Sequence, residues 1–337
     1  MKKLSVCMFI AFALMRGQAQ EVTKVGTTAA KFLSIPVGSR ALAMGGAFVA
    51  EASDASGMYW NPAGIGRLFQ SEAVFAHAEW IADINFNYGG IIVPVEGLGT
   101  VGVSFTSMTT DEMERTTITD PEGTGEMFSV GSFALGVSYA RQLTEWFTLG
   151  VSTKYVNEHI WNSSATGFAV DIGTLFTTPF PGLTFGAGIS NFGTKLSMGG
   201  DDLIVLQDVS PNHGNNANIN ARLSTDDFDL PLTLRIGFSY DPLVDDFQQL
   251  TLVLDALHPN DNSESICAGA EYRLFHKIVA LRGGYKSLGA KDSEEQFTLG
   301  AGVQYEVSAG VTAKVDYAYL KFGLLSNVHT FTIGILF

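Results

Sequence analysis

Apolar and polar residues alternate with period two along most of the chain from Glu72 onward. In the stretch "GVTAKVDYAYL", apolar side chains fall on one face, and threonine, lysine and aspartate fall on the other. The stretches "FTLGAGVQY" and "LTLRIGFSY" repeat this pattern. Each segment has about ten residues, the length that a tilted strand needs to cross a bilayer. A face of small and polar residues suits a wet lumen, and the opposite face suits lipid, so the pattern predicts transmembrane β-strands.

This segmentation gives an even number of strands, as is typical of bacterial outer-membrane barrels. We therefore predict an all-β fold, a 14-stranded antiparallel transmembrane β-barrel over residues 71–337. The predicted strands cover 72–81, 85–95, 98–107, 129–141, 145–157, 164–177, 182–191, 231–241, 247–257, 264–274, 276–286, 296–306, 310–320 and 327–337.

The predicted connections are sorted by length, which is a second and independent signal. Those after even strands are tight, whereas most of those after odd strands are longer. Outer-membrane barrels have short periplasmic turns and long external loops, so we expect both chain ends at the short-turn, periplasmic rim. The external loops are predicted at 108–128, 158–163, 192–230, 258–263, 287–295 and 321–326, with 82–84 as the short exception; 108–128 and 192–230 are the longest.

The last predicted strand places four large apolar side chains on one face and ends on an aromatic residue: Phe331, Ile333, Ile335 and Phe337. Such an ending looks like the signal that the barrel assembly machinery recognises, which makes that machinery an expected partner during biogenesis. The alternative is an ordinary apolar strand that happens to end on phenylalanine.

The first nineteen residues have the three parts of a cleaved secretory signal peptide. Lys2 and Lys3 form a basic region, 4–15 is apolar, and Gly17 to Ala19 gives a small-x-small cleavage site. We therefore expect export to a bacterial outer membrane, with lipid around the barrel. The net charge of −14 argues against nucleic-acid binding. After cleavage only Cys267 remains, on the predicted lumen face, so no intrachain disulfide is expected.

Residues 20–70 precede the first strand and are predicted to fold as a plug, or hatch, inside the barrel. Eight strands leave an interior that side chains fill, and sixteen leave a channel, so fourteen strands need additional filling or an open pore. Within 39–68, paired glycines permit positive φ or close backbone approach. We expect Ser53 or Asp54 to cap a short helix from Ala55 to Tyr59 or Trp60, ending before Pro62. The hatch motif comprises Gly45, Gly46, Asp54, Tyr59, Trp60, Asn61, Pro62 and Gly64.

The wording "GSRALAMGGAFVA…DASGMYWNPAGI" resembles the amino-terminal region of the FadL-like outer-membrane barrel superfamily and, more closely, the PorV/PorQ family. The FadL-like resemblance implies a fourteen-stranded barrel with an amino-terminal hatch that carries long-chain fatty acids or other hydrophobic compounds. The PorV/PorQ resemblance implies the same barrel in type IX protein secretion. There it receives cargo from the translocon by the cargo's carboxy-terminal domain and passes it to the attachment complex.

Neither a catalytic site, a metal site nor a cofactor is predicted, and we expect no enzyme activity. The histidines are scattered singly, without metal-ligand spacing: His77, His159, His213, His258, His276 and His329. Acidic clusters occur in predicted external loops at Asp111-Glu112, Asp201-Asp202, Asp226-Asp227 with Asp229, and Asp261 with Glu264. Calcium binding and a solvated acidic rim are both open there, but the spacing is not that of an EF-hand, which favours the rim.

The 192–230 loop contains one apolar run within an Asn/Asp-rich frame: Leu203, Ile204, Val205 and Leu206. A loop this long is usually functional or disordered, so it is either a mobile surface loop or a partner-docking element. Two functions follow from these predictions. The first is a non-enzymatic component or shuttle partner in type IX secretion, with secretion-system subunits and cargo carboxy-terminal domains as partners. The alternative is a FadL-like transporter with a hydrophobic ligand.

Overall fold

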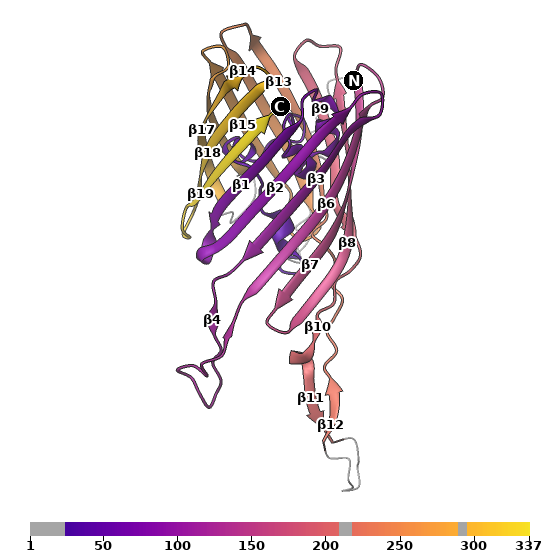
Figure 1. Ribbon diagram of the computed structural model, residues 1–337, viewed down its shortest axis with the longest axis vertical. Coiled ribbons are helices and arrows are strands. Elements are labelled where there is room, and N and C mark those ends of the chain that lie inside the picture. Colours follow the sequence, from indigo (N-terminus) through magenta and orange to yellow (C-terminus); the bar gives the residue numbers. More distant parts are fainter. Residues whose placement is uncertain (1–23, 209–217, 289–294) are drawn as a thin grey trace, which may run out of the picture.

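The computed structural model describes residues 24–208, 218–288 and 295–337. Within these residues, fourteen long strands form one closed antiparallel barrel (Figure 1), as predicted. The barrel closes because the first and last strands pair and because β8 pairs with β9. The strands are β1 (Glu72–Trp80), β2 (Ile84–Val95), β3 (Gly99–Thr109), β6 (Val130–Gln142), β7 (Phe147–Ile160), β8 (Ser163–Thr177), β9 (Leu183–Gly193), β13 (Thr233–Val244), β14 (Gln249–Pro259), β15 (Ser265–Leu274), β16 (Val279–Leu288), β17 (Glu295–Ser308), β18 (Val311–Phe322) and β19 (Val328–Leu336).

The two faces of the barrel wall follow the predicted alternation. On β17 and β18, Leu299 and Val315 are 53% and 55% exposed on the outer surface, whereas Thr298 is fully buried. Cys267 is buried beside an exposed Ile266, which places its thiol toward the lumen as predicted. Successive side chains of a strand point to opposite faces, so one apolar–polar period yields an apolar outer wall and a polar inner wall. The described residues include no helix long and apolar enough to cross a membrane.

Connection lengths define the two ends of the barrel, which we call the short-turn end and the long-loop end. The prediction of a longer loop at 158–163 was wrong. β7 and β8 continue until only residues 161–162 separate them. Ile160 pairs with Ser163 across this turn, and Trp161 has φ 52°. Strand pairing thus extends the hairpin beyond the point where the sequence alternation weakens.

The carboxy-terminal end lies at the short-turn end as predicted, whereas the first described residues, from 24 on, lie at the long-loop end, contrary to the prediction. The amide of Phe337 donates to the carbonyl of Ser71 beside the start of β1, at the short-turn end. Thr28, however, bridges Asp229 in the connection between β9 and β13. Ion pairing of Lys31 with the buried Asp261 holds the same segment at the long-loop end. Residues 24–31 therefore begin at the long-loop end, and the chain runs through the lumen toward β1.

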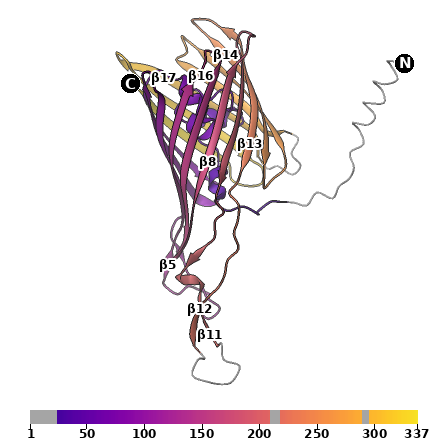
Figure 2. The same cartoon turned by 90° about the vertical axis from the view of Figure 1, so that its right-hand side faces the viewer.

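Two hairpins project from the long-loop end (Figures 1 and 2). The first contains β4 (Met113–Glu114) and β5 (Met127–Phe128), within the predicted loop 108–128. The second lies within 192–230 and contains β10 (Gly199–Gly200), η4 (Asp201–Leu203), β11 (Ile204–Gln207) and β12 (Ile219–Arg222). We call the paired strands β11 and β12 the distal hairpin, because β10 joins the barrel at β8 and they do not.

Residues 30–67, which we call the inner segment, lie inside the barrel (Figure 2). They form short helices rather than strands: η1 (Lys31–Ser34), α2 (Ser39–Ala43), α3 (Gly57–Trp60) and η2 (Pro62–Arg67). A further single turn, η3 (Ile81–Asp83), joins β1 to β2. Nearly every residue between 30 and 65 is buried, and their apolar side chains pack against inward-facing residues of the barrel. The inner segment is therefore the core around which the barrel closes.

Candidate functional site

Two glycines let the inner segment touch the barrel wall after α2. Gly45 and Gly46 have φ of 72° and 75°, which disfavour side-chain-bearing residues. A Cβ added at Gly45 would lie 2.8 Å from the backbone oxygens of Ala268 and Tyr285, so only glycine fits there. The Gly45 amide donates to Thr298 Oγ1 at 2.9 Å, and that hydroxyl donates to the carbonyl of Ala43. The turn is thereby bonded directly to β17.

The predicted helix begins later than expected. α3 starts at Gly57, with Ser56 as its N-cap, and not at Ala55. Asp54 instead stabilises the preceding turn, because its Oδ1 accepts from the amide and the hydroxyl of Ser56 at 2.9 and 2.5 Å. Local side-chain-to-backbone bonding of this kind competes with helix formation and delays its start.

Asn61 joins three parts of the molecule. Its Nδ2 donates to the carbonyls of Val49 and of Thr174 on β8, at 2.7 and 3.0 Å. Its Oδ1 accepts from the Ala63 amide, which caps η2, with Pro62 as the first residue of that helix. Gly64 is required because a Cβ there would lie 1.9 Å from the carbonyl oxygen of Ala52. The predicted turn at 61–64 is thus a capped 3-10 helix fastened to the barrel.

Tyr59 and Trp60 pack against a buried arginine on β13. The guanidinium of Arg235 lies 5.7 Å from the Tyr59 ring centroid and 5.5 Å from that of Trp60. Trp60 Nε1 donates to the Val37 carbonyl at 2.9 Å. Burial raises the pKa of Tyr59 to about 12, although Arg235 opposes that shift, so its hydroxyl stays protonated at neutral pH. The Arg235 charge is therefore met by aromatic rings, by the hydroxyl of Ser190, to which it donates at 2.8 Å, and by electrostatic attraction to the buried Asp255.

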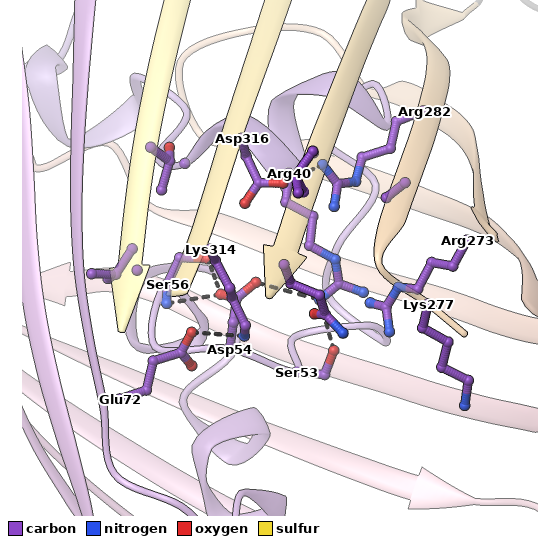
Figure 3. A pocket seen from close by; sticks show the side chains of 18 of the residues that line it. Arg40, Ser53, Asp54, Ser56, Glu72, Arg273, Lys277, Arg282, Lys314 and Asp316 are labelled. Atoms are coloured by element: carbon purple, nitrogen blue, oxygen red, sulfur yellow. Dashed lines mark hydrogen bonds and ion pairs between the residues drawn. The ribbon is translucent and has the colours of Figure 1, made fainter. Parts of the chain in front are cut away.

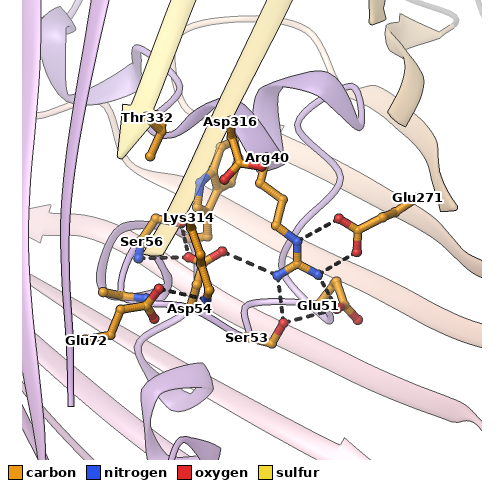
Figure 4. Close-up of polar contacts among 12 residues, drawn as sticks. Arg40, Glu51, Ser53, Asp54, Ser56, Glu72, Glu271, Lys314, Asp316 and Thr332 are labelled. Atoms are coloured by element: carbon orange, nitrogen blue, oxygen red, sulfur yellow. Dashed lines mark hydrogen bonds and ion pairs between the residues drawn. The ribbon is translucent and has the colours of Figure 1, made fainter. Parts of the chain in front are cut away.

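A second buried arginine, Arg40 on α2, is surrounded by carboxylates (Figure 4). It makes two bonds to Glu271, at 2.9 and 3.0 Å, and further ion pairs with Glu51 at 2.7 Å and Asp54 at 3.3 Å. Burial alone would lower the pKa of the Arg40 guanidinium, but these carboxylates raise it well above its ordinary value. Ser53 accepts one more of its N–H groups. Arg40 is therefore a charged hub that links the inner segment to the barrel.

Glu271, on β15, extends this network along the wall. Its carboxylate also forms ion pairs with Arg273 at 2.8 Å and with Arg282 at 2.6 Å. Arg282 in turn pairs with Asp316 on β18 at 2.5 Å. The hatch motif derived from the sequence included Asp54 but none of the other members of this network. The available signal was the isolated charges on the lumen face of β15, β16 and β18, of which the sequence analysis considered only those of "GVTAKVDYAYL", as part of a wet lumen.

Two cavities lie on opposite sides of the inner segment. The cavity toward the short-turn end has about 260 Å³ and a mostly polar lining with several charged side chains, which include Arg40, Arg273 and Lys314 (Figure 3). The cavity toward the long-loop end has about 430 Å³, and its lining is largely apolar and aromatic. Tyr59, Trp60, Arg235 and Cys267 all line this second cavity, so part of the predicted hatch motif forms its wall.

The remaining predicted site residues lie away from both cavities. Leu203 ends η4, and Ile204, Val205 and Leu206 lie in the distal hairpin. Ile204 and Leu206 are 40% and 65% exposed. The four residues of the proposed assembly signal all point outward from the end of β19 and are about half exposed: Phe331, Ile333, Ile335 and Phe337.

The model of the family described as type IX secretion system protein PorV matches residues 18–201, more than half of the chain. The chain belongs to the PorV family. This match spans the inner segment and β1–β9, which include the hatch motif. No curated protein matches this PorV-family chain.

Solved structures similar to the PorV-family chain are FadL-like barrels. The CymD monoaromatic hydrocarbon channel is 14% identical, with a TM-score of 0.56, over 90% of this chain and 97% of that one. The Pseudomonas putida toluene transporter TodX is 11% identical, with a TM-score of 0.54, over 88% and 96%. A Pseudomonas aeruginosa FadL homologue is also 11% identical, with a TM-score of 0.50, over 87% and 96%. At these identities the likeness shows the fold, and with the family it makes the chain an outer-membrane β-barrel.

Proposed function

We propose that this chain is a non-enzymatic outer-membrane component of type IX protein secretion, acting as a docking or shuttle partner for cargo. The observation that carries the proposal is the PorV family match over residues 18–201. It is supported by a lumen filled with packed residues, which suits a docking platform better than an open pore. On this proposal the inner segment is the hatch, the first nineteen residues are a cleaved signal peptide, and the end of β19 is read by the barrel assembly machinery.

We further propose the distal hairpin as the contact for secretion-system subunits or cargo carboxy-terminal domains. Its two strands pair only with each other among the described residues, so both edges are open to a partner strand. An isolated two-stranded hairpin is marginally stable in water, and a partner would stabilise it. Ile204 and Leu206 are two positions apart on β11, so they lie on the same face. They supply apolar anchors on a projection rich in aspartate.

The first test removes the chain from its native bacterium. Cargo with carboxy-terminal sorting domains should then accumulate in the periplasm, as measured by surface labelling and fractionation. In complementation, the Ile204→Asp/Leu206→Asp double variant should assemble as a barrel in the outer membrane but should not restore secretion of cargo. The reason is that the substitutions place charges at the proposed contact. The matched control is Leu324→Asp, on an exposed loop at the same end of the barrel. Unchanged surface cargo in the deletion strain would refute the proposal.

The larger cavity favours a second candidate function, transport of a hydrophobic compound. Its lining includes Phe32, Trp60, Trp80 and Leu257. A groove of about 330 Å³ on the outer wall shares Leu257 and Ser265 with it, so these side chains separate the cavity from the lipid-facing surface. Gentle purification followed by mass spectrometry distinguishes the two functions. Co-purifying fatty acid or hydrocarbon supports transport, and co-purifying cargo and secretion subunits support docking.

A further inference from the structure

The charged cavity at the short-turn end is lined by two cations, Arg273 and Lys277, that make fewer ion pairs than the neighbouring Arg40 and Arg282. Three guanidinium groups share the single carboxylate of Glu271, which accepts three N–H groups from Arg40 and Arg282 and forms an ion pair with Arg273. Arg40 and Arg282 have further carboxylate partners in the same network. Arg273 makes only one ion pair, to Glu271, within the described part of the chain. Its other N–H groups are therefore available toward the cavity that it lines.

Lys277 lines the same cavity from the turn between β15 and β16. Among the residues described, its amine makes no ion pair, and the carboxylate that attracts it is that of the exposed Asp245. Figure 3 shows Lys277 and Arg273 on the same side of the cavity. The two residues thus present a planar guanidinium and an ammonium from neighbouring backbone positions.

The turn that presents Lys277 is held in an unusual conformation. Phe275, His276 and Lys277 have φ of 54°, 58° and 67°, although none of them is glycine. The His276 amide donates to the Phe247 carbonyl at 3.0 Å, and the Phe247 ring packs edge-to-face against Phe275. Three consecutive left-handed residues persist only where surrounding contacts impose them. The position of the lysine backbone is therefore set before any ligand arrives.

We propose that Arg273 and Lys277 form a binding site for a carboxylate group that enters the barrel from the short-turn end. An arginine fork matches the two oxygens of a carboxylate, and the lysine adds a point charge. The cavity, at about 260 Å³, is smaller than an ordinary ligand pocket and fits the end of a ligand. This carboxylate group belongs either to a free small acid or to the carboxyl terminus of a polypeptide. This site does not depend on the secretion or the transport proposal.

The local charge balance favours a monoanion over phosphate. Three arginines and two lysines surround the cavity and its network, and five carboxylates oppose them: Glu51, Asp54, Glu72, Glu271 and Asp316. Because the charges already balance, a second negative charge on the ligand would be repelled without gaining another cation. A singly charged carboxylate is therefore the better match.

The test measures binding to the purified full-length protein in detergent by isothermal titration calorimetry. The probes are sodium acetate, N-acetyl-dialanine with a free carboxyl terminus, the same peptide with a terminal amide, and inorganic phosphate. We expect the free-acid peptide to bind and its amide to fail. Equal binding of acid and amide, or tighter binding of phosphate, would overturn the proposal. Acetate as tight as the peptide would support the site and identify a small acid as its source.

Lys277→Gln should weaken binding of the free-acid peptide by about tenfold, because it removes one charge-assisted hydrogen bond. This variant keeps the Glu271 network intact, so its effect does not depend on the stability of the barrel. Arg273→Gln should weaken binding at least as much, with folding checked by resistance of the barrel to unfolding in detergent. The control is Arg141→Gln, an exposed arginine at the same end but outside this cavity. Wild-type affinity in Lys277→Gln would rule the site out.

Discussion

The two sides of the inner segment place a buried arginine in opposite environments. Toward the short-turn end, Arg40 is ion-paired with three carboxylates. Toward the long-loop end, Arg235 contacts two aromatic rings and a hydroxyl and has no ion pair to a described carboxylate. A buried charge is costly unless it is paired or hydrogen-bonded. Arg40 therefore holds the inner segment to the barrel wall through ion pairs. Arg235 instead presents its charge to the larger cavity, which it lines.

The largest expected effect is from removing the paired arginine. Arg40→Met leaves Glu271, Glu51 and Asp54 without their shared cation in a buried site. We expect the free energy of unfolding to fall by about 3–5 kcal/mol, as measured by denaturant titration in detergent. Arg115→Met is the control, because Arg115 pairs with Glu126 on an exposed hairpin, where such pairs contribute at most about 1 kcal/mol. An equal loss of unfolding free energy in both variants would mean that the buried ion pairs of Arg40 stabilise the protein no more than a surface pair does.

A smaller effect is expected from crowding the inner segment itself. Gly64→Ala places a methyl group against the backbone of Ala52, so either the segment or its contact must shift. We expect a loss of about 1–3 kcal/mol in the same measurement. Gly89→Ala is the matched control, since a Cβ at Gly89 would meet nothing within 4 Å. If Gly64→Ala left the free energy of unfolding unchanged, the inner segment that separates the two cavities would be more deformable than the close contact implies.

The smallest effect should come from the unpaired arginine. Arg235→Met retains most of the side-chain volume and loses the interaction with Tyr59 and Trp60, the hydrogen bond to Ser190 and the attraction to Asp255, for an expected loss of about 1–2 kcal/mol. Thermal unfolding of this variant beside Arg40→Met gives the comparison directly. A loss as large as that of Arg40→Met would mean that Arg235 also has a mainly structural role, contrary to our interpretation of the larger cavity.

The sequence predicted the barrel well because its main determinant is local. Alternation with period two identifies each strand and its outward face, so residues such as Leu299 and Val315 could be placed without knowing their neighbours. The turn after Ile160 was missed because Trp161, a bulky residue, adopts φ 52°, a conformation that its residue type does not indicate. Likewise α2 has only five residues, and its stability comes from burial in the lumen.

The candidate sites were predictable only in part, because their decisive contacts are distant in sequence. The hatch motif could be recognised, since Asn61, Pro62 and Gly64 have local roles in capping and close approach. The pairing of Arg40 with Glu271 joins residues 231 positions apart. Alternation shows that Glu271 faces inward but not which side chain meets it across the lumen. The start of the inner segment at the long-loop end depends on equally distant contacts with Asp229 and Asp261.

The course of the inner segment has a consequence for the order of assembly. It enters at the long-loop end, traverses the lumen and leads directly into β1, which completes the cylinder by pairing with β19 along eight residue pairs. If that seam formed first, residues 30–67 would have to thread through a finished ring, a route that folding chains avoid. We therefore expect β1 and β19 to pair last, after the inner segment has taken its place in the lumen.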